Sequence, residues 1–200
     1  MRWFKVNPDS GKETQLYSGI ALVLNIGAEV YEAEPLEDIH ISGNSLTCAP
    51  ARIVRKMNWD ERIARLFACD CASHTLRIFE GWRPNEKRPR RAIEVAREYT
   101  NGRADANALQ KAWGDARDTA SSTKYKESAY TDLIAYFAAR AASDCAAVDV
   151  EWGERSATFA AAARSGSTRD KKGTTVNQSI AWIDERKWQV ERLMQYLETP

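Results

Sequence analysis

The spacing of the hydrophobic residues changes near residue 57, and this change restricts the chain to a mixed architecture. Before it, apolar residues form short runs rich in β-branched and aromatic side chains, separated by Asn, Asp, Ser and Gly residues that favour tight turns. After it, apolar residues recur at helical spacing. The sequence therefore predicts an α+β fold: a small N-terminal antiparallel β subdomain over residues 1–57, followed by a mainly α-helical bundle of five or six helices over residues 58–200.

The β subdomain is expected to hold three to five strands. The apolar run from Leu16 to Ile26 is the ambiguous part, because a short continuous apolar run fits a strand or a buried helix equally well.

Capping residues divide the second part of the chain into helices. Asn58 with Glu61 predicts a helix start, Gly81 a stop, Pro89 a second start and Asp105 a third. The expected helices are Trp59–Glu80, Pro89 to Asn101, one after Asp105, one from about Tyr125 to Trp152 that Gly153 divides from a continuation to Arg164, and one from Thr175 to Leu197.

Alanine dominates the middle of this helical part. Between Ala104 and Ala163, 19 of 60 residues are alanine. Small side chains let helix axes approach closely, so a tightly packed bundle is expected. The Ser- and Gly-containing stretch 165–174 is expected to be a mobile, solvated loop.

Composition narrows the function classes. The net charge of +1 argues against general nucleic-acid binding, and no apolar run is long enough for a membrane span. No signal peptide is expected, and four irregularly spaced cysteines do not suggest a disulfide framework. These features predict a cytoplasmic protein without a membrane partner.

Two polar pairs interrupt the apolar helix faces. Asp70 and His74 are four residues apart in the first helix, and Arg140 and Asp144 are four apart in the fourth. Together they could form one buried network that fixes helix register, or they could line a catalytic or small-ligand pocket. No nucleophile motif, phosphate loop or metal-ligand spacing accompanies them. We therefore predict no catalytic residue, no metal and no cofactor.

A basic turn lies between the first two helices. Five positive residues and one negative residue fall within nine positions; the positive ones are Arg83, Lys87, Arg88, Arg90 and Arg91. The turn could contact an acidic partner protein, or its arginines could neutralise nearby glutamates. Without interleaved aromatic residues it is a poor platform for nucleic acid.

Counted by segment, the net charge is −1 over residues 1–57, +3 over residues 58–104 (10 basic, 7 acidic) and −1 over residues 105–200. The basic turn is therefore a local feature of an otherwise balanced surface.

Trp182 and Trp188 lie off the apolar stripe of the last helix. Aromatic residues beside Arg186 and Lys187 have the composition of a protein-binding surface. The alternative is that both rings pack under the N-terminal sheet.

Three segments carry a resemblance: Arg65–His74, Leu76–Glu80 and Arg88–Arg97. A Cys-Ala pair, an apolar helix end, a proline-rich turn and an Arg-Pro-Arg-x-Ala-Ile-Glu helix with a glycine stop resemble a family of alanine-rich helical proteins of bacteria and phages, the putative immunity proteins. The resemblance covers about residues 62–165. It implies a helical, non-enzymatic module that binds and neutralises another protein.

The resulting hypothesis is a protein-binding inhibitor that acts by stoichiometric binding to a toxin or to a bacterial defence complex, the latter as an anti-CRISPR-like phage protein. The candidate contacts are the basic turn and the two tryptophans. The alternatives are an enzyme or small-ligand binder that uses Asp70, His74, Arg140 and Asp144, and a nucleic-acid-binding accessory protein. The sequence leaves the oligomeric state open.

Overall fold

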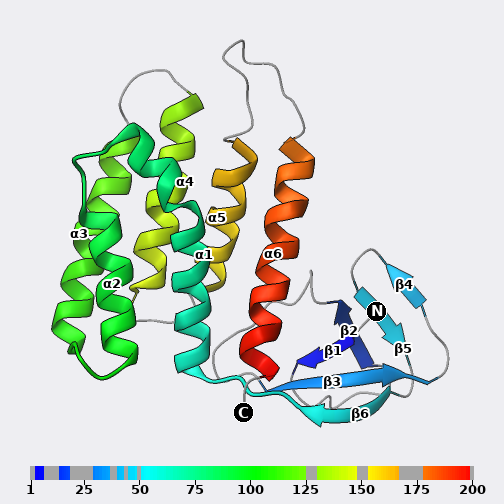
Figure 1. Cartoon of the computed structure of the whole chain (residues 1–200). Helices are drawn as coiled ribbons and strands as arrows, with labels where there is room; N and C mark the ends of the chain where they lie inside the picture. Colours follow the sequence, from blue (N-terminus) through cyan, green and yellow to red (C-terminus); the bar gives the residue numbers. More distant parts are fainter. Residues whose placement is uncertain are drawn as a thin grey trace. The chain divides into compact units, whose positions relative to one another are not determined.

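The computed structural model describes residues 3–6, 14–18, 29–36, 40–42, 45–48, 51–124, 130–147, 153–166 and 178–198 (Figure 1). The chain divides into two compact units, one of residues 1–61 with 190–200 and the other of residues 62–189. We call these the sheet unit and the helical unit. The division falls inside the last helix, after Gln189, and the α+β fold class is confirmed.

The sheet unit holds a six-stranded sheet whose described strand pairs are all antiparallel. The strand order is β4-β5-β2-β1-β3-β6. This is one strand more than expected, because Ser45–Cys48 has too few apolar residues to stand out in the sequence pattern. The strands are β1 (Trp3–Val6), β2 (Thr14–Ser18), β3 (Val30–Pro35), β4 (His40–Ser42), β5 (Ser45–Cys48) and β6 (Ala51–Lys56).

The ambiguous run from Leu16 to Ile26 begins in β2, and its positions 19–26 lie outside the described residues. Val30, Ala33 and Cys48 are buried in the sheet unit. Ion pairs join β3 to the edge strand β6, among them Arg55 Nε with Glu32 Oε2 at 2.8 Å.

Six helices follow, within the predicted range. Asp105 starts the third by accepting a hydrogen bond from the Ala108 amide at 2.8 Å, and Gly102 follows the second with a φ of 69°. The helices are α1 (Glu61–Trp82), α2 (Arg88–Thr100), α3 (Ala106–Lys124), α4 (Tyr130–Cys145), α5 (Gly153–Gly166) and α6 (Gln178–Glu198).

Two helix ends differ from expectation. The first helix continues through Gly81 to Trp82, since a glycine near a helix end weakens the helix without breaking it. The fourth helix ends at Cys145, where the chain turns, instead of continuing to Trp152. Positions 148–152 and 167–177 lie outside the described residues, so the expected loop 165–174 is described only at 165–166, within α5.

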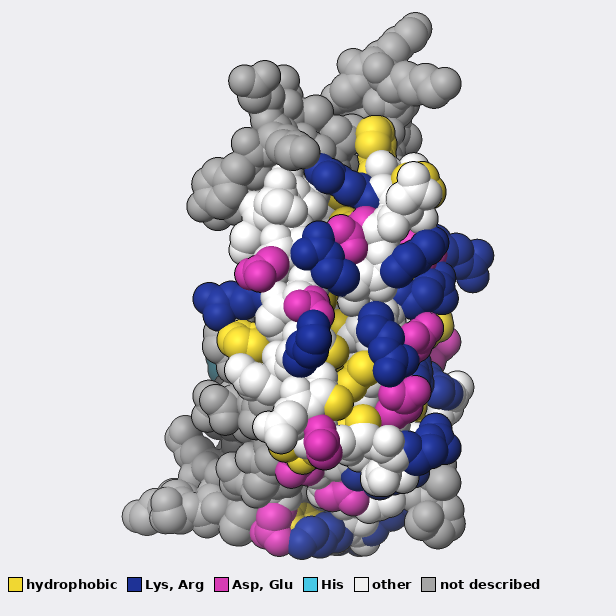
Figure 2. All heavy atoms as spheres, turned by 90° about the vertical axis from the view of Figure 1, so that its left-hand side faces the viewer, with side chains coloured by type: hydrophobic (Ala, Val, Ile, Leu, Met, Phe, Trp, Pro, Cys, Tyr) yellow, Lys and Arg dark blue, Asp and Glu magenta, His cyan; other side chains and the backbone are white. Residues whose placement is uncertain are grey.

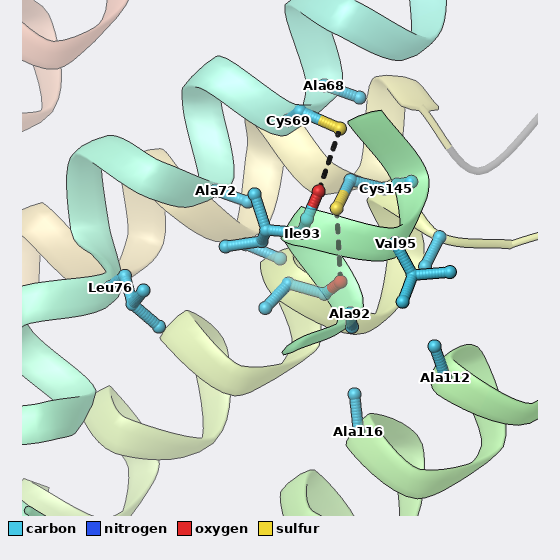
Figure 3. Close-up of a cluster of buried hydrophobic side chains, with 14 of the residues drawn as sticks. Ala68, Cys69, Ala72, Leu76, Ala92, Ile93, Val95, Ala112, Ala116 and Cys145 are labelled. Carbon is cyan, nitrogen blue, oxygen red and sulfur yellow. Dashed lines mark hydrogen bonds between the residues drawn. The ribbon is translucent and has the colours of Figure 1, made fainter. Parts of the chain in front are cut away.

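Buried alanines from α1 to α5 form the core of the helical unit. Figure 3 shows side chains of α1, α2 and α3 meeting, with Cys145 of α4 among them. The fully buried alanines include Ala72, Ala96, Ala116 and Ala160, each with no exposed surface. Alanines therefore form much of the core, as close approach of the helices requires.

Cysteines lie within this core as free thiols. Cys145 donates a hydrogen bond to the Ala142 carbonyl at 3.1 Å, and Cys69 points toward the Ile93 carbonyl at 4.0 Å (Figure 3). Burial raises the pKa of the Cys71 and Cys145 thiols well above the ordinary value. These two thiols are therefore protonated at neutral pH and are not activated nucleophiles.

Replacing Ala116 with leucine tests the packing. Ala116 has no exposed surface, so three added carbons must displace neighbouring helices, and we expect a loss of about 1–3 kcal/mol in the free energy of unfolding. Urea unfolding followed by helical circular dichroism measures the loss. Ala108→Leu, at an exposed position of the same helix, is the control and should change stability by less than about 0.5 kcal/mol. Equal stability of both variants would contradict close packing.

Candidate functional site

Asp70 pairs with an arginine of the neighbouring helix. Its Oδ1 accepts a hydrogen bond of 2.6 Å from Nη2 of Arg97 in α2, and the same nitrogen lies 3.2 Å from the Ser73 hydroxyl. The Asp70 side chain is 9% exposed. The pair thus joins α1 to α2 through a charge-assisted bond.

His74 pairs with the last helix. Its Nδ1 lies 2.9 Å from Oε2 of Glu185, whose side chain is fully buried. The imidazole also stacks on the Trp188 indole, with ring centroids 3.9 Å apart and planes inclined by 20°. Gln189 donates a hydrogen bond of 3.2 Å to the other Glu185 oxygen. These contacts join α1 to α6 within the helical unit.

Arg140 and Asp144 lie 3.1 Å apart within α4, as their spacing of four suggests. The Asp144 side chain is fully buried, and the Arg140 guanidinium lies over the Phe159 ring of α5. Asp70 therefore pairs with a residue of α2, and His74 pairs with a residue of α6. Arg140 and Asp144 pair with each other within α4.

Sequence reasoning missed Arg65, which is 2% exposed. Its Nη1 donates hydrogen bonds to the Ala147 carbonyl at 2.7 Å and the Cys145 carbonyl at 3.4 Å, and the guanidinium lies over the Tyr99 ring. The positive charge therefore sits at the negative end of the α4 dipole. The sequence signal that could have identified Arg65 is the presence of a cation on an apolar face of the helix.

The interior polar groups are largely sealed from solvent. The exposed fractions are 9% for Asp70, 12% for Arg140 and zero for Asp144, against 33% for His74. Their contacts account for helix-to-helix attachment, and only the imidazole reaches the surface appreciably. This arrangement favours the structural interpretation of the cluster over the catalytic one.

Arginines of the basic turn form ion pairs with glutamates on the same surface. Arg90 binds both oxygens of Glu80 at 2.6 and 2.7 Å, and Arg88 binds both oxygens of Glu86 at 2.5 and 2.8 Å. Arg91 lies 3.4 Å from Glu94 and 3.3 Å from Glu98. Hydrogen bonds from the paired arginines lower the pKa of the Glu80 and Glu86 carboxyls. Part of the basic turn's charge is therefore neutralised within the chain.

Arg83 and Lys87 differ from the other basic residues of the turn. Within the described part of the chain, neither forms an ion pair. Trp82, which sequence reasoning also missed, immediately precedes Arg83 and is 56% exposed. Its position after the glycine expected to end the helix hid it from the periodicity argument.

Of the two tryptophans in the last helix, the structure describes the side chain of Trp188 alone. Trp188 is half-buried, stacked on His74 and packed against the alanine core. The Trp182 side chain lies outside the described residues.

Within the described residues, no group of three or more His, Cys, Asp or Glu residues is arranged to hold a metal ion. No helix among them is long and apolar enough to span a bilayer.

His74→Ala tests the structural role of the imidazole. The variant removes the stack on Trp188 and leaves the buried Glu185 carboxylate without its neighbour, so we expect a loss of about 2 kcal/mol. The measurement is urea unfolding of the full chain. Arg77→Ala, exposed on the same helix, should change stability by less than about 0.5 kcal/mol. A His74 variant as stable as the Arg77 variant would rule out the structural role.

Arg90→Met tests the surface ion pair through pH. Because Arg90 lowers the pKa of the Glu80 carboxyl, the pair stabilises the chain above the ordinary carboxyl pKa and ceases to do so as the pH falls through the lowered value. We expect the variant to be about 0.5 kcal/mol less stable at neutral pH and as stable as the wild type in strong acid. Thermal unfolding across the acid range measures this, with Arg103→Met as a control. A difference that persists in acid would exclude the ion pair as its cause.

Comparison with models of known protein families shows which family the helical part of the chain matches. The model of the family described as "Imm-5 like putative immunity protein" matches residues 58–196. No curated protein and no solved structure is significantly similar to the chain. The match covers more than half of the sequence, including α1 to α5 and nearly all of α6. The chain therefore belongs to the Imm-5 like putative immunity protein family.

Proposed function

We propose that this chain is a non-enzymatic inhibitor that neutralises a partner protein, a toxin, by stoichiometric binding. The observation that carries the proposal is the family match over residues 58–196, because the family is named for immunity. A bacterial defence complex, blocked in the manner of an anti-CRISPR protein, is the alternative target. We propose that the encounter takes place in the cytoplasm.

The distribution of polar groups supports a binding role. The interior carboxylates and guanidiniums attach helices to one another, whereas the exterior carries exposed charged side chains. On the face formed by α2 and α3, Lys and Arg side chains lie among Asp and Glu side chains (Figure 2). Such a mixed surface suits a specific protein contact better than diffuse attraction to a polyanion.

The basic turn is the proposed contact. Its backbone is fixed by hydrogen bonds from the Arg83 amide to the Phe79 carbonyl at 2.9 Å and from the Glu86 amide to the Arg83 carbonyl at 3.0 Å. The Arg91 amide bonds the Lys87 carbonyl at 2.9 Å. A turn already ordered before binding loses little conformational entropy in a complex.

The last helix is the second proposed contact. The Trp188 ring stacks on His74 but is only half-buried. Its accessible edge is therefore proposed to contact the partner. Trp182 is retained as a proposed contact on its sequence position alone.

Acid–base catalysis is the second candidate function, and one observation favours it. A buried carboxylate beside Nδ1 of a partly exposed imidazole can orient that imidazole as a general base. Against it, Trp188 covers the imidazole ring, and the nearby Cys71 thiol is buried with a raised pKa. His74→Ala should then leave inhibition intact, whereas a catalytic role predicts its loss beyond any loss of folded protein.

Titration of the partner tests the proposal. The tagged chain is expressed in its own host, crosslinked to what it binds, and the captured protein is purified and assayed for toxicity. We expect its activity to fall linearly with added chain and to reach its minimum at a fixed molar ratio, because each inhibitor molecule occupies one target.

Loss of the partner's activity at substoichiometric amounts of chain, increasing with time, would show turnover and contradict the proposal. An absence of inhibition by excess folded chain would also overturn it.

A further inference from the structure

We propose that Trp82, Arg83 and Lys87, here called the Trp82 corner, form the part of the basic turn that receives an acidic segment of the partner protein. This inference rests on the proposed inhibitory function and specifies its contact chemistry. The corner ends α1 and opens the turn to α2, at the upper left of the helical unit in Figure 1.

Trp82 provides the apolar part of the corner. Its side chain is 56% exposed, the largest exposed fraction among the exposed large hydrophobic residues of the described chain. Gly81, which precedes it on α1, is also exposed. An accessible tryptophan next to arginine has the composition of an interface hot spot.

Arg83 and Lys87 provide the charge. Arg88 and Arg90 are each held by both oxygens of a glutamate, and Arg91 lies between Glu94 and Glu98. Arg83 and Lys87 keep no ion-pair partner among the described residues. Their charges can therefore be directed at a second molecule without first breaking an internal pair.

The charges of Arg83 and Lys87 affect the pKa of neighbouring carboxyl groups. Arg88 chiefly lowers the pKa of Glu86, and Arg83 adds to the effect; Arg90 chiefly lowers that of Glu80, and Lys87 adds to it. The corner thus combines two cations with an exposed tryptophan that immediately precedes the first of them in the chain. Carboxylates of an acidic segment complement the two cations, while an apolar residue of that segment covers the indole.

Protein fits this corner better than nucleic acid does. A duplex binder needs a row of cations that neutralises many phosphates, whereas the corner holds two cations that form no ion pair among the described residues. A single-strand binder needs several stacking rings, whereas the corner offers one. The chain's net charge of +1 provides no long-range attraction to a polyanion.

The test uses the full chain labelled with ¹⁵N and, as probe, a short peptide of glutamate residues with leucine residues between them. The Trp82 indole signal is assigned by its loss in Trp82→Phe. We expect that signal to shift on titration, and the affinity to fall about tenfold in Arg83→Glu and in Lys87→Glu. Arg103→Glu is the matched control, since it makes the same charge change at an exposed position beyond α2, and it should bind as the wild type does.

Three results would overturn the inference: an unchanged Trp82 signal, an equal loss of affinity in Arg103→Glu, or an equal shift with duplex DNA of matched charge. The partner titration tests the broader proposal separately. If the wild-type chain inhibits its partner and Trp82→Ala and Arg83→Glu inhibit equally well, only the present inference fails. If the folded wild-type chain does not inhibit, the proposed function fails whatever the peptide result.

Discussion

The Arg65 guanidinium bonded to the carbonyls at the end of α4 is the contact on which the helical unit most depends. Alanine faces fit together in several registers, because a methyl group leaves few features to interlock. A buried cation against the negative end of a helix has one acceptable position, since displacement would leave it without acceptors. The Ser156 hydroxyl adds a second fixed point, within 2.9 Å of the Ala141 carbonyl and 3.0 Å of the Ala68 carbonyl.

This arrangement separates the roles of the polar residues. The interior pairs, such as Asp70 with Arg97 and His74 with Glu185, attach α1 to α2 and to α6. With those groups engaged in attachment, the surface is left to meet other molecules. Trp82 is exposed at the end of α1, and Arg83 and Lys87 form no ion pair among the described residues. The proposed binding function is the explanation that we offer for these features.

Local signals in the sequence predicted the α+β class and most helix boundaries. Asp105 acts at the start of α3 through a hydrogen bond to an amide three residues on, so short-range reasoning finds it. Strand β5 was missed because Ser45–Cys48 carries little apolar signal.

Pairing between distant segments could not be predicted in the same way. Asp70 was expected to pair with His74, four residues on, whereas its bond is to Arg97 across two helices. His74 contacts Glu185, which is far away in the sequence. Periodicity identifies the face on which a polar residue lies but does not identify the helix that packs there.

Hydrogen exchange of the chain, free and bound to its captured partner, tests the account most directly. If the Trp82 corner meets the partner, we expect added protection at the backbone amides of Trp82, Arg83 and residues 85–88. Protection of the amides around Asp70 and His74 should be unchanged, since the interior pairs are already formed before binding. Protection gained around His74 with none at residues 82–88 would contradict it, because function would then reside in the groups assigned to the interior.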